Sequence, residues 1–345
     1  MRAMVLEGVR QLRLREVPDP KPGPRDVVIK VAYCGVCMTD VHIYTGSVPV
    51  EMPRIMGHEV SGTVVETGSE VSRVSMGDRV AVNPIVNCGY CWHCIRGKTN
   101  LCENRLSIGG LRGGLNGAYA EYVKAPEDNV VKYDKDVSLR YAALTEPLAC
   151  AVHAVDLARV SLGDVVVVIG AGPMGLMLTQ LLLISGASKV IVLDLKDERL
   201  RLAEQLGASH VINPQKADPL KSIKEITDGD LADIVIEAVG SISAIQDAFR
   251  YIRTGGRMVI FGVPPRDALA SFLPFNIYFK EQEIIGSHAV SKESFIRAAK
   301  LISQGKISLE ELISEIYDLE DLEKALIRAE RGEGLKKLIC VAKED

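Results

Sequence analysis

The chain has 345 residues, of which 47% are hydrophobic, and this length and composition allow two domains with sizeable cores. Its formal charge of −4 gives no electrostatic basis for binding nucleic acid or an anionic membrane. The first residues lack an apolar core of signal-peptide length, and no uncharged apolar stretch reaches the roughly 18 residues that a membrane span needs. We therefore expect a cytoplasmic protein, in which clustered cysteines are metal ligands more often than disulfides.

The first third of the chain contains short β-type runs separated by glycine and proline, at 27–33, 60–66, 79–82 and 119–124. This pattern indicates a compact, irregular β domain.

Metal-binding residue types stand among and after these runs: Cys37, His58 with the adjacent Glu59, and Glu146. Two or three such ligands, with one coordination position left open, suit a catalytic zinc ion. Equally, Cys37 could be a small buried hydrophobe and His58 a core histidine, because long spacings prove no proximity.

Four of the eight cysteines lie within fifteen residues, in the pattern C-x2-C-x2-C-x7-C. Four thiolates from one segment can complete a tetrahedral shell round zinc, so the sequence predicts a structural zinc site in a lobe spanning 88–102. An iron–sulfur cluster is the competing interpretation, but the bacterial ferredoxin run has its fourth cysteine after three residues, followed by proline. His93 could also bind zinc, but four cysteines already saturate the site. The predicted ligands are Cys88, Cys91, Cys94 and Cys102.

From about residue 162 apolar strands alternate with helical periods. The run 164–169 is continuously apolar, as expected where both faces of a parallel sheet are covered. Further strands are expected at 189–193, 233–238, 257–261 and 283–285. Such alternation over about 120 residues indicates a doubly wound α/β domain.

A glycine-rich turn follows the first of these strands and opens a helix expected over 174–183. Its first glycine permits a tight turn, its second lets a pyrophosphate approach the backbone, and its third allows close helix–strand packing. The same turn could belong to an α/β domain that binds no nucleotide. The candidate cofactor-binding residues of the turn are Gly170, Gly172, Pro173, Met174 and Gly175.

Asp194 stands nineteen residues after Gly175, at the end of the next expected strand. An acid there hydrogen-bonds the adenosine ribose and supports a dinucleotide site. Its carboxylate would repel a 2′-phosphate, so NAD is predicted in preference to NADP. Lys196 and Arg199 keep NADP as the alternative, and Arg199 is a further candidate cofactor contact.

After residue 287 the chain is expected to form helices at 292–303 and 321–331 and a final strand at 337–341. This tail is too short to bury a core alone, so we expect it to return to the first domain. The expected domains are 1–150, 151–287 and 288–345, the last of these completing the first.

The run from Gly57-His-Glu-Val-Ser-Gly62 to Gly77-Asp78-Arg-Val80 resembles the signature of the zinc-containing medium-chain alcohol dehydrogenases. The four-cysteine lobe and the glycine-rich turn follow at the positions that this family uses, and the likeness covers essentially the whole chain. The resemblance implies a GroES-like β-rich catalytic domain with an inserted Rossmann domain of doubly wound parallel-sheet type. It also implies two zinc ions per subunit and a homo-oligomer, either a tetramer or a dimer.

The resemblance assigns Cys37, His58 and Glu146 to the catalytic zinc. Many alcohol dehydrogenases have cysteine where this chain has Glu146, and glutamate there resembles the sorbitol and threonine dehydrogenase branch. Cys150, four residues later, is a rival ligand. Glu59 matches an acid beside the zinc ligands that binds the metal directly in some members.

The resemblance also gives catalytic roles to Thr39 and His42, which stand two and five residues after Cys37. Thr39 would take the alcohol proton and pass it through the nicotinamide ribose to His42 and solvent, because the proton must leave before hydride is transferred. Taken alone, Thr39 could be a turn hydroxyl and His42 a surface residue.

The implied function is NAD-linked oxidation of a secondary alcohol from the class of polyols, sugar-derived alcohols and simple secondary alcohols, with no nucleic acid or membrane partner. L-threonine 3-dehydrogenase is the runner-up, because Gly286-Ser-His-Ala lacks the Arg-Tyr pair that sorbitol dehydrogenases place nearby. A zinc-binding NAD-sensing protein is the non-enzyme alternative, although such a protein would lose Cys37, His58 or the relay. Tyr44 and His288 are candidate pocket residues.

Overall fold

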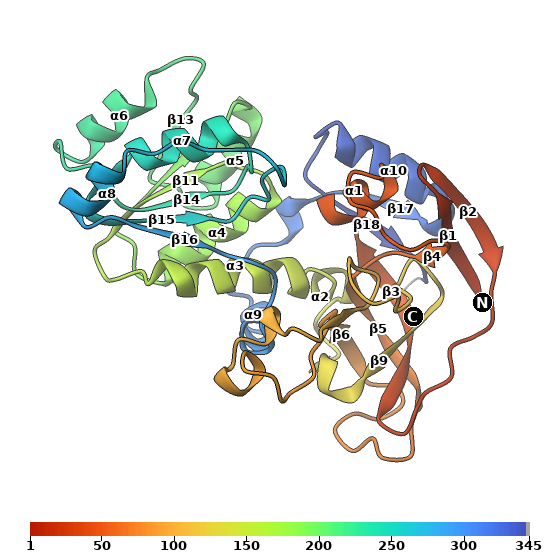
Figure 1. Ribbon diagram of the computed structural model, residues 1–345. Helices are drawn as coiled ribbons and strands as arrows, with labels where there is room; N and C mark the ends of the chain where they lie inside the picture. Colours follow the sequence, from red (N-terminus) through yellow and green to blue (C-terminus); the bar gives the residue numbers. More distant parts are fainter. Residues whose placement is uncertain (343–345) are drawn as a thin grey trace. The chain divides into compact units, whose positions relative to one another are not determined.

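The computed structural model describes residues 1–342 and separates them into two compact units, each drawn in Figure 1. Unit 1 contains Met1–Cys150 together with the chain from Val290 onward, and unit 2 contains Ala151–Ala289. The sequence analysis placed these junctions at 150/151 and 287/288. Among the described residues, no helix combines the length and the apolar character that crossing a bilayer requires.

The main sheet of unit 1 contains strands from both the first and the last parts of the chain. Its strands lie in the order β10-β6-β5-β3-β18-β17, and β9 also pairs with β3. The C-terminal β18 runs antiparallel to β3, with Leu338 opposite Gly35, so the chain's end is part of the first domain. The strands are β3 (Asp26–Gly35), β5 (Glu59–Thr67), β6 (Arg79–Val82), β9 (Tyr122–Pro126), β10 (Val130–Tyr133), β17 (Ile313–Asp318) and β18 (Lys336–Cys340).

Shorter elements surround this sheet. A three-stranded sheet has the order β2-β1-β4, and the pair β7–β8 brackets the cysteine lobe. The strands are β1 (Arg2–Gly8), β2 (Gln11–Glu16), β4 (Arg54–Ile55), β7 (Ile85–Val86) and β8 (Leu106–Ser107). The helices are α1 (Met38–Tyr44), α2 (Leu139–Ala142), α9 (Lys292–Ser303) and α10 (Leu322–Glu330), while α3 (Thr145–Ala158) spans the junction at 150.

Unit 2 is a doubly wound α/β fold whose six strands are all parallel, in the order β13-β12-β11-β14-β15-β16. The order reverses between β11 and β14, and ligands bind at such a switch point beyond the carboxyl ends of the strands. The strands are β11 (Val165–Ile169), β12 (Lys189–Leu193), β13 (His210–Ile212), β14 (Ala232–Glu237), β15 (Ile252–Ile260) and β16 (Glu283–Gly286). The helices are α4 (Pro173–Ile184), α5 (Asp197–Gln205), α6 (Pro219–Ile226), α7 (Ile242–Arg250) and α8 (Pro274–Lys280).

Two of the predicted strands begin several residues away from their expected start. The run expected at 119–124 becomes a strand only from Tyr122, because Ala120 makes an isolated bridge with Ala3 instead. The strand expected from 257 begins at Ile252, since Gly255 continues it with a φ of +73° that other residues rarely adopt.

Candidate metal centres and cofactor site

Cys37 is positioned by the start of α1, directly after β3. Its sulfur caps the helix by accepting a hydrogen bond from the Thr39 backbone N–H at 3.5 Å. Its own N–H donates to Asp40 Oδ2 at 3.0 Å, which completes a capping box. The helix end thereby fixes Cys37 and offers positive backbone dipoles to its sulfur.

His58 and Glu59 reach Cys37 through the pairing of β3 with β5, in which Glu59 lies opposite Gly35. Each of the three residues offers one ligand atom, and the three atoms lie within 4.8 Å of one another. Gly35 is required for this approach, because a Cβ there would lie 1.8 Å from Glu59 Oε2.

Asp40 is a member of this site that the sequence analysis missed. It is fully buried, and its Oδ1 lies 3.4 Å from His58 Nδ1. Its Oδ2 accepts a hydrogen bond from the Tyr119 hydroxyl at 3.0 Å. Burial acts to lower the pKa of His58, but the interactions with Asp40 and Cys37 together outweigh burial and raise that pKa. Carboxylates behind metal-binding histidines commonly orient the ring, and Asp40 faces Nδ1 of His58 at charge-pair distance.

Lys336 was also missed. Its ammonium donates to Glu59 Oε1 at 2.5 Å, and both side chains are buried. The signal was weak in the sequence, because nothing local links a lysine near the C-terminus to a glutamate 277 residues earlier.

Glu146 lies in the first turn of α3, outside the group of three candidate ligands. It is buried, and its Oε1 accepts a hydrogen bond from Cys150 Sγ at 3.4 Å, as expected for residues four apart on a helix. Burial raises the pKa of Glu146. Burial and the neighbouring Glu146 also raise the pKa of the Cys150 thiol, which therefore acts as a hydrogen-bond donor. Glu146 and Cys150 therefore remain candidate zinc ligands next to the group of three.

The group of three fits a zinc ion. Glu59 Oε2 is buried and has no hydrogen-bond partner among the described residues, although such an atom normally has one. One thiol, one imidazole and one carboxylate are ligands that zinc accepts, and three protein ligands are typical of a catalytic zinc.

Thr39 and His42 lie three residues apart on α1 and are both half-buried, so they share one face of this helix. Their role in a proton relay remains a prediction. Tyr44 is buried, and its hydroxyl donates to Glu323 Oε1 at 2.7 Å. Burial and this contact raise the pKa of Tyr44 to about 12. The Tyr44 hydroxyl therefore already has a hydrogen-bond partner on α10.

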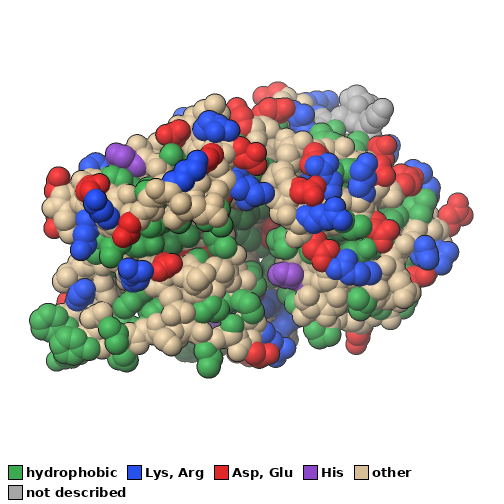
Figure 2. Space-filling view, turned by 90° about the horizontal axis from the view of Figure 1, so that it is seen from above, with side chains coloured by type: hydrophobic (Ala, Val, Ile, Leu, Met, Phe, Trp, Pro, Cys, Tyr) green, Lys and Arg blue, Asp and Glu red, His purple; other side chains and the backbone are tan. Residues whose placement is uncertain are grey.

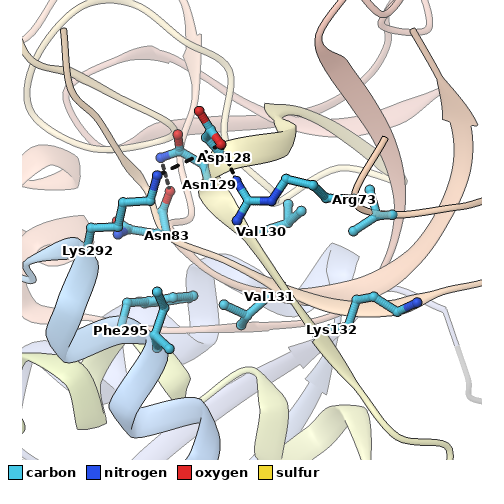
Figure 3. A pocket seen from close by; sticks show the side chains of 11 residues that line it. Arg73, Asn83, Asp128, Asn129, Val130, Val131, Lys132, Lys292 and Phe295 are labelled. Atoms are coloured by element: carbon cyan, nitrogen blue, oxygen red, sulfur yellow. Dashed lines mark hydrogen bonds and ion pairs between the residues drawn. The ribbon is translucent and has the colours of Figure 1, made fainter. Parts of the chain in front are cut away.

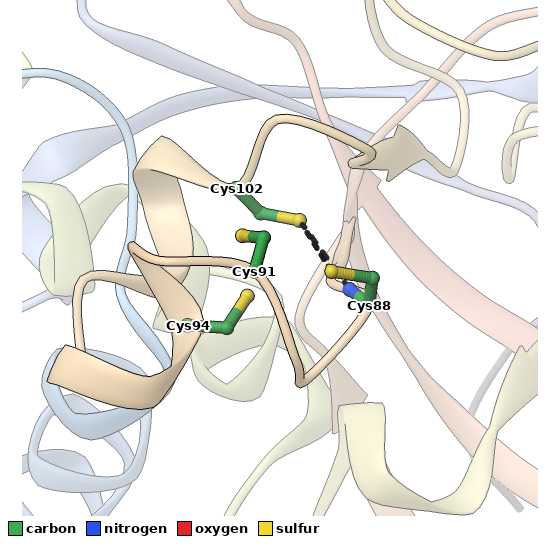
Figure 4. A group of neighbouring side chains, drawn as sticks. All are labelled: Cys88, Cys91, Cys94 and Cys102. Atoms are coloured by element: carbon green, nitrogen blue, oxygen red, sulfur yellow. Dashed lines mark hydrogen bonds between the residues drawn. The ribbon is translucent and has the colours of Figure 1, made fainter.

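The four predicted lobe cysteines lie together, with ligand atoms within 4.8 Å of one another (Figure 4). A dashed line in that view joins Cys88 and Cys102, whose sulfurs are 3.5 Å apart. Backbone N–H groups also point at these sulfurs, since the Cys88 amide donates to Cys102 Sγ at 3.4 Å.

The pKa values of two lobe thiols shift in opposite directions. Burial acts to raise the pKa of Cys88, but hydrogen bonds from the Tyr90 and Cys91 amides outweigh it and lower that pKa to about 6. Burial and the neighbouring sulfurs raise the pKa of Cys94 to about 12. The close grouping of four cysteine sulfurs therefore fits a zinc ion, which accepts a shell of four thiolates. His93 lies outside this group, with Nε2 3.7 Å from Glu103.

The glycine-rich turn in unit 2 has the geometry of a phosphate cradle. Gly170 has a φ of +103°, and a Cβ on Gly175 would lie 1.8 Å from the Gly170 carbonyl oxygen, so both positions require glycine. Gly172 is the N-cap of α4 and Pro173 its first residue. A Cβ on Gly172 would meet only Arg199 Nη1, at 3.9 Å, which leaves room for a ligand at the helix N-terminus.

Asp194 follows β12 and is fixed to this turn. Its Oδ2 accepts a hydrogen bond from the Ala171 N–H at 2.7 Å, and its Oδ1 accepts one from the Lys196 N–H at 2.8 Å. The same carboxylate can accept ribose hydroxyls through its remaining lone pairs. The residues of unit 2 thus fit a dinucleotide.

Unit 1 also has a hollow of about 280 Å³ that contains none of the candidate ligands (Figure 3). Its charges are paired with one another. Arg73 contacts Asp128, Lys292 Nζ lies 3.9 Å from Asp128, and Lys132 bonds Asp78 at 2.8 Å. We therefore propose no binding or catalytic role for this hollow.

Family comparisons agree with both halves of this architecture. The family described as alcohol dehydrogenase GroES-like domain matches residues 23–135, and the family described as zinc-binding dehydrogenase matches residues 173–304. The sorbitol dehydrogenase of Bacillus subtilis (strain 168) is 33% identical over 333 residues, covering 95% of this chain and 93% of the relative.

Two solved structures are similar over nearly their whole length. A protein of Sinorhizobium meliloti 1021, described as a zinc-binding dehydrogenase and bound to NADP, superimposes with a TM-score of 0.93 at 34% identity. The 2R,3R-butanediol dehydrogenase of Bacillus subtilis gives 0.90 at 31% identity. Each comparison covers 99% of both chains. The fold and sites define a zinc-type alcohol oxidoreductase. The chain belongs to the zinc-containing medium-chain alcohol dehydrogenase family, in its sorbitol dehydrogenase-like branch.

Proposed function

We propose that this protein oxidises a secondary alcohol to a ketone with NAD as hydride acceptor, using one zinc ion for catalysis and a second for structure. The observation that carries the proposal is the buried group of Cys37, His58 and Glu59, which is separate from the closed shell of four cysteines. A shell with three protein ligands leaves a position for substrate, whereas four thiolates leave none.

Different residues of the chain would bind the zinc ion, transfer the proton and position the cofactor. Cys37, His58 and Glu59 would hold the catalytic zinc, while Asp40 fixes the imidazole orientation. A zinc ion held by these residues would supply Lewis-acid chemistry, polarising the alcohol oxygen and lowering the pKa of the alcohol. Thr39 accepts the proton that leaves the alcohol, and His42 on the next turn of α1 passes it toward solvent. NAD supplies the redox chemistry as hydride acceptor, while Asp194 and the glycine-rich turn position it.

The substrate class follows from the relatives together with the site. Polyols, sugar-derived alcohols and simple secondary alcohols lead, because relatives across the whole chain are named sorbitol and butanediol dehydrogenases. L-threonine is the second candidate substrate. The non-enzyme alternative is a zinc-binding NAD sensor, which would need none of the proton relay.

Purified protein should contain two zinc ions per subunit and reduce NAD with at least one member of a panel. The panel contains sorbitol, xylitol, 2,3-butanediol, 2-propanol and L-threonine, and metal is measured by mass spectrometry. Ethanol serves as the primary-alcohol control. One zinc ion per subunit and no turnover would leave only the zinc-binding sensor.

Replacing Asp194 by alanine should raise the NADP-to-NAD ratio of kcat/KM by about 100-fold or more. A carboxylate and a phosphate charge about 4 Å apart repel each other by about 4 kcal/mol at an effective dielectric of 20, and 1.4 kcal/mol is a factor of ten. Asp197→Ala is the matched control, because Asp197 is already bonded to Asn213 and Lys216. An unchanged ratio in Asp194→Ala would show that another residue selects the cofactor.

We propose a homo-oligomer, as a dimer or tetramer, assembled through unit 2. Six large hydrophobic side chains on and before α8 are between 66% and 89% exposed, and exposed apolar surface of this extent is typical of an interaction surface. Figure 2 shows hydrophobic side chains gathered at the end of the molecule where Figure 1 places α8. Light scattering at several concentrations measures the assembly. The residues are Val263, Leu269, Leu273, Phe275, Tyr278 and Phe279.

A further inference from the structure

Lys336 takes no part in the proposed chemistry, yet its side chain ends at the candidate catalytic centre. It is 5% exposed, and Nζ donates to Glu59 Oε1 at 2.5 Å and to the Val36 carbonyl at 3.0 Å. Because β18 pairs with β3, the last strand of the chain delivers a buried cation to a site built from the first sixty residues.

The two carboxylate oxygens of Glu59 have different surroundings. Oε1 accepts the Lys336 hydrogen bond, while Oε2 is buried without a hydrogen-bond partner among the described residues. Oε2 also packs closely over Gly35, where a Cβ would lie 1.8 Å away. One oxygen is therefore held by the ammonium, and the other remains for a metal.

The charges explain why a cation belongs here. Asp40, Glu59 and Glu146 are all buried, and Cys37 lies in the same group of candidate ligands as Glu59. A divalent ion together with the Lys336 ammonium would offset much of the negative charge that these groups carry when ionised.

We propose that Lys336 is a positioning residue of the catalytic metal centre, which holds Glu59 Oε1 and so restricts this carboxylate to one oxygen for the zinc ion. A carboxylate free of such a partner can bind a metal through both oxygens. Binding through both would fill the coordination position that substrate needs. The inference rests on the proposed function, because it requires zinc at Cys37, His58 and Glu59.

The test compares Lys336→Met with Lys337→Met in the full-length protein. Lys337 is a matched control, because it is the next residue on the same strand and is also buried. Its ammonium donates to the backbone carbonyls of Glu333 and Leu335. Neighbouring strand residues point to opposite faces, so the control removes a buried lysine without releasing Glu59.

Two readouts separate a positioning role from a structural one. The first is the rate at which 1,10-phenanthroline removes the catalytic zinc from cofactor-free protein. The second is the visible absorption of protein carrying Co²⁺ at this site, which weakens when coordination rises above four. We expect Lys336→Met to release zinc more slowly by about tenfold or more, the scale on which partners of metal ligands act, and to show weaker cobalt absorption. Its kcat should fall, whereas Lys336→Arg should restore all three readings.

The inference is overturned if Lys336→Met keeps the wild-type release rate and cobalt spectrum, or if Lys337→Met changes both equally. Should Lys336→Met fail to fold, Lys336→Gln replaces it, because the amide can still donate to the Val36 carbonyl but carries no charge. Wild-type protein with two zinc ions and an unaffected Lys336→Met variant would defeat only this inference. Wild-type protein with zinc in the cysteine lobe alone would defeat the proposed function as well.

Discussion

Cys37→Ala should reduce the zinc content from two ions to one and lower kcat/KM for alcohol oxidation by about 10³-fold or more. Cys37 supplies the thiolate of the three-residue centre and caps α1, so its loss removes the softest ligand and loosens the helix end that carries Thr39 and His42. A catalytic metal supplies several kcal/mol of transition-state stabilisation, and each 1.36 kcal/mol is about tenfold in rate. Metal analysis and steady-state kinetics on one preparation measure both effects.

Cys34→Ala is the matched control. Cys34 is a buried thiol three residues earlier, it lies outside the group of candidate ligands, and its sulfur donates to the backbone carbonyl of Gly35 at 3.7 Å. This variant should keep two zinc ions and substantial activity. A Cys37→Ala protein that retains both zinc ions would refute the proposed centre.

The same assay ranks the two carboxylates. Glu59 lies within the group of candidate ligands and Glu146 lies outside it, so Glu59→Gln should lose zinc to chelator faster than Glu146→Gln does. The resemblance to other family members favoured Glu146 as third ligand, whereas the geometry favours Glu59. Loss of zinc in Glu146→Gln or Cys150→Ala alone would reverse that assignment.

Local patterns predicted the parts of the fold that depend on local physics. The strands at 79–82 and 189–193 and the helix at 292–303 are confirmed at the residues expected. Continuous apolar runs and helix caps act within one element, so the chain carries these signals directly. Strands β13 and β17 were missed, because His210–Ile212 is only three residues long and Ile313–Asp318 mixes acidic with apolar residues.

The residues of the candidate sites also divide into those found from local sequence motifs and those brought together only by the fold. The lobe cysteines and the glycine-rich turn are contiguous motifs, and the structure brings their members together. Asp40 could have been found from its capping-box spacing after Cys37. Lys336 could not, because its contact with Glu59 depends on the pairing of β18 with β3 across the whole chain.

Cys102→Ser should remove the lobe zinc, leave the catalytic zinc in place and unfold the lobe locally. Cys102 is fully buried, and its sulfur joins the segment's end to Cys88 at 3.5 Å, so its loss opens the shell of four sulfurs. Structural zinc contributes about 10 kcal/mol or more to ordering small cysteine-rich peptides. The lobe has little apolar core to replace that energy, since Tyr90, Trp92 and Ile95 are 59% to 74% exposed.

Trypsin reports this unfolding, because Arg96 and Lys98 are exposed within the lobe. We expect cleavage there to accelerate by about 100-fold or more, since the protease cuts the opened form and the lost metal stabilised the closed one. Cys340→Ser is the control, because Cys340 lies on β18 outside both cysteine-containing groups and its replacement should leave two zinc ions and slow cleavage. If Cys102→Ser instead loses the zinc of Cys37 and His58 while the lobe resists trypsin, the four cysteines do not form the structural site. Retention of one zinc with fast cleavage would show that the two ions have separate tasks: the lobe ion orders a segment, and the other ion serves the reaction.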